Sequence, residues 1–434
     1  MPADERALTD ALAALDDHRD DELRIDGLAA TELAERYDTP LYVFSARALD
    51  DRLAAVRAAL GARVELLYSI KANPSLAVTG RLRRGGAGAE VASLGELHLA
   101  LAAGHDAPSL RFAGPGKTEV EIAAAVALGL GTFHVESHDE IDTIAAAATA
   151  AHRRVRVAVR VNLPQQLAGA RMRMGGRSSR FGIDEDQVPA AIERVGQHPH
   201  LDLAGLHVYA GTQCFDAGAF VQHATAIVTR AAAWERELGV PLDELDLGGG
   251  FGVPTSAGDP TFDLAAAGRG LGELIAAHDR PTRRWFVELG RYLTAPCGVY
   301  LTRVVRTKDS GGERHVVLDG GMHQCAAAAG MGSVIKRAPL LVHATDLRGE
   351  DRAPVSLGGP LCTPADQFAA DLELPPLAAG DLVAILNAGA YGISYSPTGF
   401  LSHATPAEVM VEAGKARVVR ERGDSRDVLR GQQP

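Results

Sequence analysis

Lysine is scarce in this chain of 434 residues, where it occurs only five times, and arginine supplies most of the positive charge. Acidic residues still outnumber basic ones, and the formal net charge is −11. An acidic protein repels the phosphates of nucleic acids and of anionic lipid surfaces, so neither is an expected partner. The sequence also lacks an apolar run of the ~20 residues that are needed to span a bilayer. These absences argue against nucleic-acid and membrane functions.

Cysteine is also rare, and the cysteines are scattered without a C-x-x-C pair, at Cys214, Cys297, Cys325 and Cys362. This spacing argues against a zinc cage and against a disulfide framework. The histidines show no metal-ligand spacing either, so we expect no metal. The N-terminus has no basic region followed by a long apolar stretch, which argues against a secretory signal. We therefore expect a protein of the reducing cytoplasm.

Short β-branched runs alternate with Ala-rich stretches of helical periodicity from about Leu41 onward. These runs predict strands at Val64–Ile70, Ala89–Ala92, Leu110–Ala113, Thr132–Glu136, Val155–Asn162, Leu203–Ala210, Leu245–Leu247 and Trp285–Leu289. Ser93 and Glu96 have the spacing of a capping box at the start of one helical stretch. Eight strands that each neighbour a helix indicate a (β/α)8 barrel, which we predict over residues 41–298.

The pattern changes after about Gly298, where strands follow one another with little helix between them. They are predicted at Val299–Thr307, His315–Leu318, Leu340–Ala344, Pro354–Leu357, Leu382–Leu386 and Val409–Val419. The chain is long enough for two domains. We therefore expect a mostly β second domain made of residues 299–434 together with 1–40, which include a predicted helix at Ala30–Tyr37.

Lys71 is the lysine with the most unusual surroundings, because it directly follows the apolar run Val64–Ile70 and precedes Ala-Asn-Pro. Catalytic groups of barrels lie at the C-terminal ends of the strands. A partly desolvated lysine there would have a lowered pKa and a free amine that can attack a carbonyl. Position alone equally allows a lysine whose stem packs on the rim while its amine reaches water.

Two further motifs follow the last two predicted barrel strands. In Gly248-Gly249-Gly250-Phe251-Gly252, the missing Cβ atoms would let backbone N–H groups converge on a phosphate, although a tight structural turn would look the same. Glu288 ends the eighth strand, and a carboxylate there could keep a cofactor's pyridine nitrogen protonated. Arg291 would suit a phosphate or a carboxylate, although a salt bridge on the rim explains the Glu288 and Arg291 pair as well.

Taken together, these motifs resemble the fold-type III pyridoxal-phosphate (PLP) decarboxylases, the family of diaminopimelate, ornithine and arginine decarboxylases. The resemblance covers nearly the whole chain, from Thr39-Pro-Leu-Tyr-Val-Phe44 to Pro406-Ala-Glu-Val-Met-Val411. Between them, in the family's order, stand Tyr68-Ser-Ile-Lys71-Ala-Asn73, Glu90-Val-Ala-Ser93, His134-Val-Glu136-Ser, Ser179-Arg-Phe-Gly182, Gly205-Leu-His207, Gly211-Thr212-Gln, the Gly248 run, Glu288-x-Gly290-Arg291, Gly359-Pro360-x-Cys362 and Gly389-Ala-Tyr391-Gly. The ordered set implies an alanine-racemase-like barrel with a β domain.

The resemblance also implies roles for the matching residues. Lys71 would form the imine with the cofactor, and Glu288 would face the pyridine nitrogen. The other implied cofactor contacts are Glu90, Tyr209, Thr212, Gly248, Gly249, Gly250, Gly290, Arg291 and Tyr391. Cys362, on the β domain, would enter the active site of a neighbouring subunit and protonate the reacting carbon, which implies a homodimer with shared sites.

The chain departs from the family's pattern at several positions. Tyr209 stands where a histidine usually stacks on the cofactor, and Leu289 replaces a proline. Thr363 stands where an acidic residue usually grips the distal amino group of a diamino acid, although Asp366 remains. Phe400-Leu-Ser-His403-Ala-Thr replaces a Tyr-Asn-x-Arg-Pro segment. The implied substrate contacts are Arg337, Thr363 and Asp366.

The resemblance therefore implies α-decarboxylation of an amino acid whose far end is not a free cation. The chain is most similar to the subgroup that acts on conjugated or carrier-protein-bound amino acids in natural-product biosynthesis. Diaminopimelate decarboxylase, with Asp366 replacing the missing acid, is the first alternative. An amino-acid racemase is another, but it needs a tyrosine base, and the Cys362 motif argues against it. A non-catalytic PLP-binding protein is the last alternative.

Overall fold

A computed structural model describes residues 3–433 apart from 17–20, 165–166, 168, 174–177 and 333–335. The chain forms two compact units. The barrel unit comprises Arg52–Gly252 and Phe262–Tyr292. The β unit comprises Met1–Asp51, Val253–Thr261 and Leu293–Pro434.

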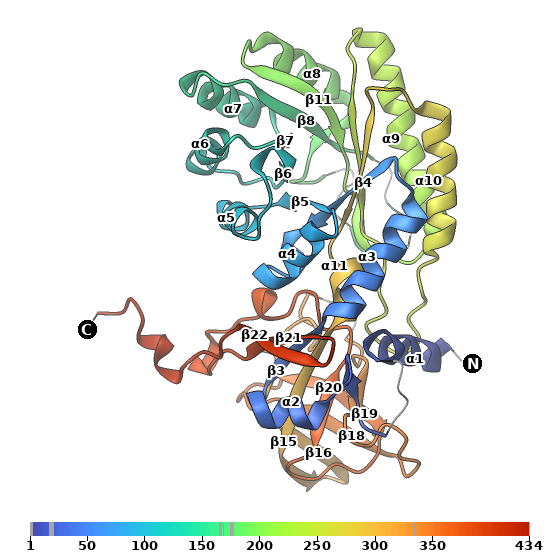
Figure 1. The fold of residues 1–434 in the computed structure, drawn as a ribbon, viewed down its shortest axis with the longest axis vertical. Helices are drawn as coiled ribbons and strands as arrows, with labels where there is room; N and C mark the ends of the chain where they lie inside the picture. Colours follow the sequence, from blue (N-terminus) through green and yellow to red (C-terminus); the bar gives the residue numbers. More distant parts are fainter. Residues whose placement is uncertain are drawn as a thin grey trace. The chain divides into compact units, whose positions relative to one another are not determined.

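The barrel unit is built on a closed ring of parallel strands (Figure 1). Their order is β8-β11-β13-β14-β4-β5-β6-β7, and β7 pairs with β8 to close the ring. The strands are β4 Val64–Ser69, β5 Gly88–Val91, β6 Leu110–Phe112, β7 Thr132–Val135, β8 Val155–Asn162, β11 Leu201–His207, β13 Glu244–Gly249 and β14 Arg284–Leu289. Each overlaps a strand predicted from the sequence, so the (β/α)8 barrel is confirmed. Outside the ring, β10 Ile183–Asp184 extends β8, and β9 Ala170–Arg173 pairs with β12 Gly211–Cys214.

Helices flank the strands of this ring (Figure 1). They are α3 Ala46–Leu60, α4 Leu76–Arg84, α5 Leu94–Ala102, α6 Glu119–Leu128, α7 His138–Ala150, α8 Val188–Gln197, α9 Ala217–Leu238, α10 Leu264–His278 and α11 Arg291–Thr294. Half of the predicted capping box of α5 is present, because Ser93 Oγ accepts a hydrogen bond from the Glu96 N–H at 3.2 Å. The Glu96 carboxylate accepts the Ala92 N–H at 2.7 Å rather than that of Ser93. In the described part of the chain, no helix is both long enough and apolar enough to cross a membrane.

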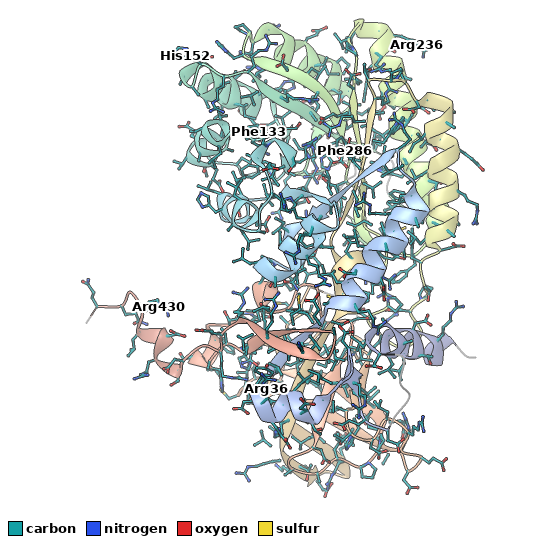
Figure 2. The ribbon with its side chains drawn as sticks, in the orientation of Figure 1. Arg36, Phe133, His152, Arg236, Phe286 and Arg430 are labelled. Carbon is teal, nitrogen blue, oxygen red and sulfur yellow. The ribbon has the colours of Figure 1, made fainter. Side chains whose placement is uncertain are left out.

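The barrel unit buries many aromatic and aliphatic side chains of its strands and helices. Phe133 on β7 and Phe286 on β14 lie among the strands (Figure 2), and their side chains are 0% and 1% exposed. Burial of such large apolar surfaces provides the main driving force for this unit. The polar side chains that the barrel nevertheless buries therefore call for a specific explanation.

The β unit contains a second sheet, with the order β19-β18-β16-β15-β3-β21-β22, while β20 pairs with β15 and β17. Its strands are β3 Leu41–Ser45, β15 Gly298–Ser310, β16 Glu313–Leu318, β17 Leu341–His343, β18 Ala353–Gly358, β19 Gln367–Leu374, β20 Leu382–Ile385, β21 Ala407–Glu412 and β22 Lys415–Arg420. Helices α1 Ala3–Leu15 and α2 Ala30–Tyr37 belong to this unit, together with the short hairpin of β1 Arg24–Ile25 and β2 Leu28–Ala29.

Three features of this sheet differ from the sequence-based prediction. Strand β3 pairs with β15 and β21, so it lies in the second sheet although the barrel was predicted to begin at residue 41. Strand β19 was not predicted. The single strand predicted at Val409–Val419 is wrong, because Ala413 and Gly414 adopt φ values of 48° and 70° and turn the chain into the β21–β22 hairpin.

Candidate active site

Lys71 lies in the short 3₁₀ turn Ile70–Ala72 that follows β4, at the C-terminal end of this barrel strand. Its Nζ lies 3.0 Å from both carboxylate oxygens of Glu90, which lies on the neighbouring strand β5. Nζ also lies 5.6 Å from the ring centroid of Tyr209. The Lys71 side chain is 38% exposed and that of Glu90 only 3%. A buried carboxylate thus orients an amine that solutes can still reach.

The glycine loop 248–250 lies on the same barrel unit. Gly248 and Gly250 have φ values of +67° and +82°, a conformation that disfavours residues with a Cβ. A Cβ at Gly250 would overlap the carbonyl oxygen of Gly211 and lie 3.1 Å from the Cα of Thr212. Glycine is therefore required for the close approach of this loop to the backbone that carries Thr212. The structure brings together these residues, which were predicted to bind a phosphate.

Gly290 and Arg291 follow β14 directly. A Cβ at Gly290 would meet the Ala72 side chain at 2.8 Å and the Ser69 carbonyl oxygen at 3.2 Å. Gly290 therefore allows the chain after β14 to pack on the turn that carries Lys71. Arg291 begins α11 beside it. The predicted cofactor residues of the barrel thus gather at the C-terminal ends of the strands.

Four strands each bring one buried polar side chain to a single cluster, which we call the buried tetrad: His134 from β7, His207 from β11, Asp246 from β13 and Glu288 from β14. The rings of His134 and His207 stack with their centroids 4.1 Å apart. His207 Nε2 lies 3.3 Å from Glu288 Oε2. His134 Nε2 lies 4.0 Å from Asp246 Oδ2.

The pKa values of the two carboxyl groups of the tetrad are shifted in opposite directions. Burial, and then the charge of Glu288, raise the pKa of Asp246 well above its usual range. Burial also acts to raise the pKa of Glu288, but the charge and hydrogen bond of His207, and then the charge of Lys71, lower this pKa below its usual range. Burial, and then the charge of His207, lower the pKa of His134. Glu288 is therefore the stronger acid of the pair.

The barrel residues fit pyridoxal phosphate. This cofactor needs an amine for its aldehyde, hydrogen-bond donors for its phosphate and an anion for its pyridinium. Lys71 supplies the amine, and the glycine loop with Thr212 supplies a backbone surface for the phosphate. Glu288 Oε1 is buried and has no hydrogen-bond partner among the described residues. This oxygen lies 3.9 Å from His134 Nδ1. A buried carboxylate oxygen without a hydrogen bond is costly, and a protonated ring nitrogen would satisfy it.

The β unit carries the other predicted site residues. Cys362 is exposed on the loop that follows β18. Asp366, in the same loop, is 5% exposed. Its Oδ2 accepts the Leu361 N–H at 2.9 Å, and its Oδ1 accepts the Met322 N–H at 2.6 Å. The carboxylate of Asp366 thus holds the backbone of the Cys362 loop and of the segment after β16. Its predicted contact with the substrate stays a prediction.

The remaining predicted residues of the β unit lie at several places within it. Thr363 is next to Cys362, and its carbonyl oxygen accepts the Asp366 N–H at 3.1 Å. Arg337 Nη1 pairs with the fully buried Asp259 at 3.2 Å, while the Arg337 side chain is 49% exposed. Tyr391 has a φ of 55° and contacts Tyr395, with ring centroids 6.0 Å apart.

Substitution of Asp366 by asparagine is expected to disorder the Cys362 loop. An amide offers one acceptor oxygen, so one of the two backbone N–H groups would face the side-chain NH₂ and lose its partner. We expect the free energy of unfolding to fall by roughly 1–3 kcal/mol and kcat to fall more than tenfold. Cofactor affinity should change little, since the Cys362 loop carries none of the predicted cofactor residues.

Asp381→Asn is the matched control, because Asp381 also accepts a backbone N–H, that of Ala378 at 2.7 Å, in another loop of the β unit. Chemical denaturation and steady-state kinetics would be measured for both variants. Equal kcat values in the two variants would argue against a specific role of Asp366 in placing Cys362.

Sequence reasoning did not recognise the functional potential of His134, His207 and Asp246. His134 and His207 stood in the motifs of the resemblance without a role, and Asp246 was not singled out. Each is a polar residue near the C-terminal end of a barrel strand, and this was the available signal. Their spacing in the sequence could not reveal the cluster, because strand order around the ring brings them together.

The comparison with protein families agrees with this geometry. The family model for the pyridoxal-dependent decarboxylases, pyridoxal binding domain, matches residues 46–295. The chain belongs to this family, and it is a pyridoxal-dependent decarboxylase with the fold-type III architecture.

Individual relatives match over nearly the whole chain. The L-glutamyl-[BtrI acyl-carrier protein] decarboxylase of Niallia circulans is 33% identical over 94% of this chain and 96% of its own length. A diaminopimelate decarboxylase of Zymomonas mobilis is 31% identical over 95% and 96%. The crystal structure of diaminopimelate decarboxylase from Helicobacter pylori complexed with L-lysine has a TM-score of 0.84 and 26% identity, over 92% of this chain and 98% of that one.

Proposed function

We propose that this enzyme removes the α-carboxyl group of an amino acid whose far end is an acyl linkage rather than a free ammonium group. The proposed substrate class is an aminoacyl group attached to a carrier protein. Two independent observations support this choice over diaminopimelate. One is the relative that acts on an L-glutamyl group of an acyl-carrier protein. The other is the chemistry of the loop that carries Cys362.

The loop chemistry is the observation that carries the proposal. Thr363 follows Cys362 and offers a hydroxyl in place of a carboxylate. Asp366, the nearby acid of the loop, is buried, and its two oxygens already accept backbone N–H groups. Neither residue provides a free anion for a distal ammonium, whose charge-assisted hydrogen bond would contribute roughly 1.5–3 kcal/mol.

The proposed roles of the barrel residues follow from their geometry. When bound, pyridoxal phosphate accepts the electrons of the breaking C–C bond into its protonated ring. Lys71 would hold the aldehyde, and Glu90 would orient the Lys71 amine from 3.0 Å. Glu288 would keep the ring nitrogen protonated, and Tyr209 would pack on the ring face. The phosphate would be held by Gly248, Gly249, Gly250, Thr212, Arg291 and Tyr391, with Gly290 keeping the backbone close.

The proposed proton donor to Cα is the thiol of Cys362 or the ammonium of Lys71. Cys362 is exposed on the β unit, where a thiol can serve a second chain. We therefore propose a homodimer in which each β unit contributes Cys362 to its partner's site. Arg337, whose side chain is half exposed, would meet an anionic part of the carrier's tether.

A panel of substrates tests the proposed function. Glutamyl thioester on an acyl-carrier protein, free glutamate, diaminopimelate, lysine, ornithine and arginine would each be assayed for release of carbon dioxide. We expect the carrier-bound group to be consumed with a kcat/KM at least about tenfold above that of any free amino acid. Brisk turnover of a free diamino acid would contradict the proposal.

Substitution of Thr363 by glutamate should shift the substrate preference. The new carboxylate would pair with a distal ammonium, so we expect kcat/KM for free diamino acids to rise by roughly ten- to a hundredfold. The carrier-bound substrate should lose activity. Thr307→Glu, on β15, is the control for the added charge. If both variants changed the preference equally, the effect would not come from the Cys362 loop.

A further inference from the structure

The buried tetrad contains more polar groups than an anion for the pyridinium requires. Glu288 alone would meet that need. Within the described residues, His134 Nδ1, His207 Nδ1 and Asp246 Oδ2 are buried and lack hydrogen-bond partners. Burial of such groups is unfavourable, so their presence on four strands indicates a function.

We propose that His207 is a positioning residue for Glu288 and that Asp246 holds the one proton shared by this carboxyl pair. Glu288 then remains the ionised group that faces the ring nitrogen of the cofactor. This inference rests on the cofactor role proposed for Glu288, but it does not depend on which amino acid the enzyme decarboxylates.

His207 fixes the orientation of the Glu288 carboxylate. Its Nε2 lies 3.3 Å from Glu288 Oε2, and this atom donates a hydrogen bond both in the Nε2–H tautomer and in the imidazolium. The stack with His134 holds the imidazole plane, with an interplanar angle of 19°. Because Oε2 is taken by His207, Oε1 is left for the ring nitrogen.

Asp246 is the member of the pair that keeps a proton. Its Oδ1 accepts the Gly248 N–H at 3.0 Å. One side-chain nitrogen or oxygen atom of each tetrad residue lies within 4.8 Å of those of the other three. Two carboxyl groups that are this close in a buried site do not both ionise. The charge of Lys71 favours ionisation of Glu288, while the charge of Glu90 opposes ionisation of Asp246.

Other charged groups near the tetrad have their own partners. They are Arg111 with Glu244 at 3.2 Å, Lys117 with Glu140 at 2.6 Å and Arg160 with Glu136 at 2.6 Å. These cations lower the pKa of His134, which favours the neutral imidazole in the stack. The asymmetry between the two carboxyl groups therefore comes mainly from burial and the charge of Glu288, which act on Asp246, and from His207 and Lys71, which act on Glu288.

Ligand binding to cofactor-free, full-length protein tests the role of His207. The two probes are pyridoxal phosphate and 1-deazapyridoxal phosphate, in which a CH group replaces the ring nitrogen. In His207→Phe, the aromatic stack remains but the donor is lost. We expect this variant to bind pyridoxal phosphate roughly ten- to a hundredfold more weakly, with an unchanged affinity for the deaza compound. His207→Gln, which restores a donor, should recover most of the difference.

His105→Phe is the matched control, because His105 is 5% exposed in the same unit but lies outside the tetrad. It should affect neither affinity. An equal loss of affinity for both probes in His207→Phe would indicate a merely structural residue and would overturn the proposal. No loss for pyridoxal phosphate would overturn it as well.

Infrared spectroscopy tests the proton on Asp246. At neutral pH, the cofactor-free protein should show the C=O stretch of a protonated buried carboxyl group, and Asp246→Asn should remove this band. Persistence of the band in Asp246→Asn would overturn the proposal. The same holds for a stoichiometric divalent metal in the purified protein, since a metal on these four residues would leave no proton to share.

Discussion

Replacement of Lys71 by alanine is expected to abolish the covalent attachment of pyridoxal phosphate and to lower kcat by about 10⁴-fold. Among the described residues of the barrel unit, Lys117 is the other lysine, and it cannot substitute. Its side chain is 1% exposed and its Nζ pairs with Glu140 at 2.6 Å. The loss would be measured in two ways. The absorbance band of the lysine-bound cofactor should disappear, and reduction with borohydride should no longer attach the cofactor permanently to the protein.

Lys71→Arg separates the amine from its charge. A guanidinium would keep a cation beside Glu90, but it cannot form an imine, so this variant should also lose labelling while retaining more stability than Lys71→Ala. Lys308→Ala, at an exposed position on β15, is the control and should behave like the wild type. Covalent labelling that persists in Lys71→Ala would refute the central role of this residue.

The barrel could be predicted from the sequence because its strands are short, apolar and regularly separated by helical stretches. Strand β8 was predicted with its observed bounds, Val155–Asn162, because its valines recur at alternate positions and the run ends at asparagine. The position of Lys71 at the end of β4 followed from the same pattern. Local sequence and global fold agree in this unit.

The second sheet could be predicted only in part, since its pairings join distant segments. Strand β3 has a fully buried pattern that suits the barrel equally well, and only its pairing with β15 and β21 places it in the β unit. Strand β19 alternates irregularly and contains Asp371 with a φ of 49°, which weakens the strand pattern. Tertiary pairing decided both elements.

Site residues could be predicted where the position of a single residue in the sequence indicates its role. They could not be predicted where the role depends on several residues that the fold brings together. Lys71, the glycine loop and Glu288 each stand directly after or at the end of a strand. The hydrogen bonds of Asp366 to two backbone N–H groups depend on the fold of the loop, so the sequence could not reveal them. The tetrad depends on strand order around the ring.

Substitution of Glu288 by glutamine is the second change with a large expected effect. The neutral amide would keep the volume of the side chain, but it would not hold a proton on the pyridine nitrogen. Because the buried carboxylate acts where water cannot screen it, we expect kcat to fall by roughly 10²–10³-fold. Covalent attachment through Lys71 should persist, which distinguishes this variant from Lys71→Ala.

Glu408→Gln controls for the loss of a buried carboxylate, since Glu408 is 5% exposed and accepts a hydrogen bond from Arg420 at 2.9 Å in the β unit. This variant should be less stable than the wild type. It should keep a kcat within about threefold of the wild-type value, because Glu408 is not one of the predicted site residues. Single-turnover release of carbon dioxide at saturating cofactor measures the chemical step in each protein. A kcat of Glu288→Gln that matches that of Glu408→Gln would mean that the ring nitrogen does not depend on Glu288, and the function inferred for the buried tetrad would then fail as well.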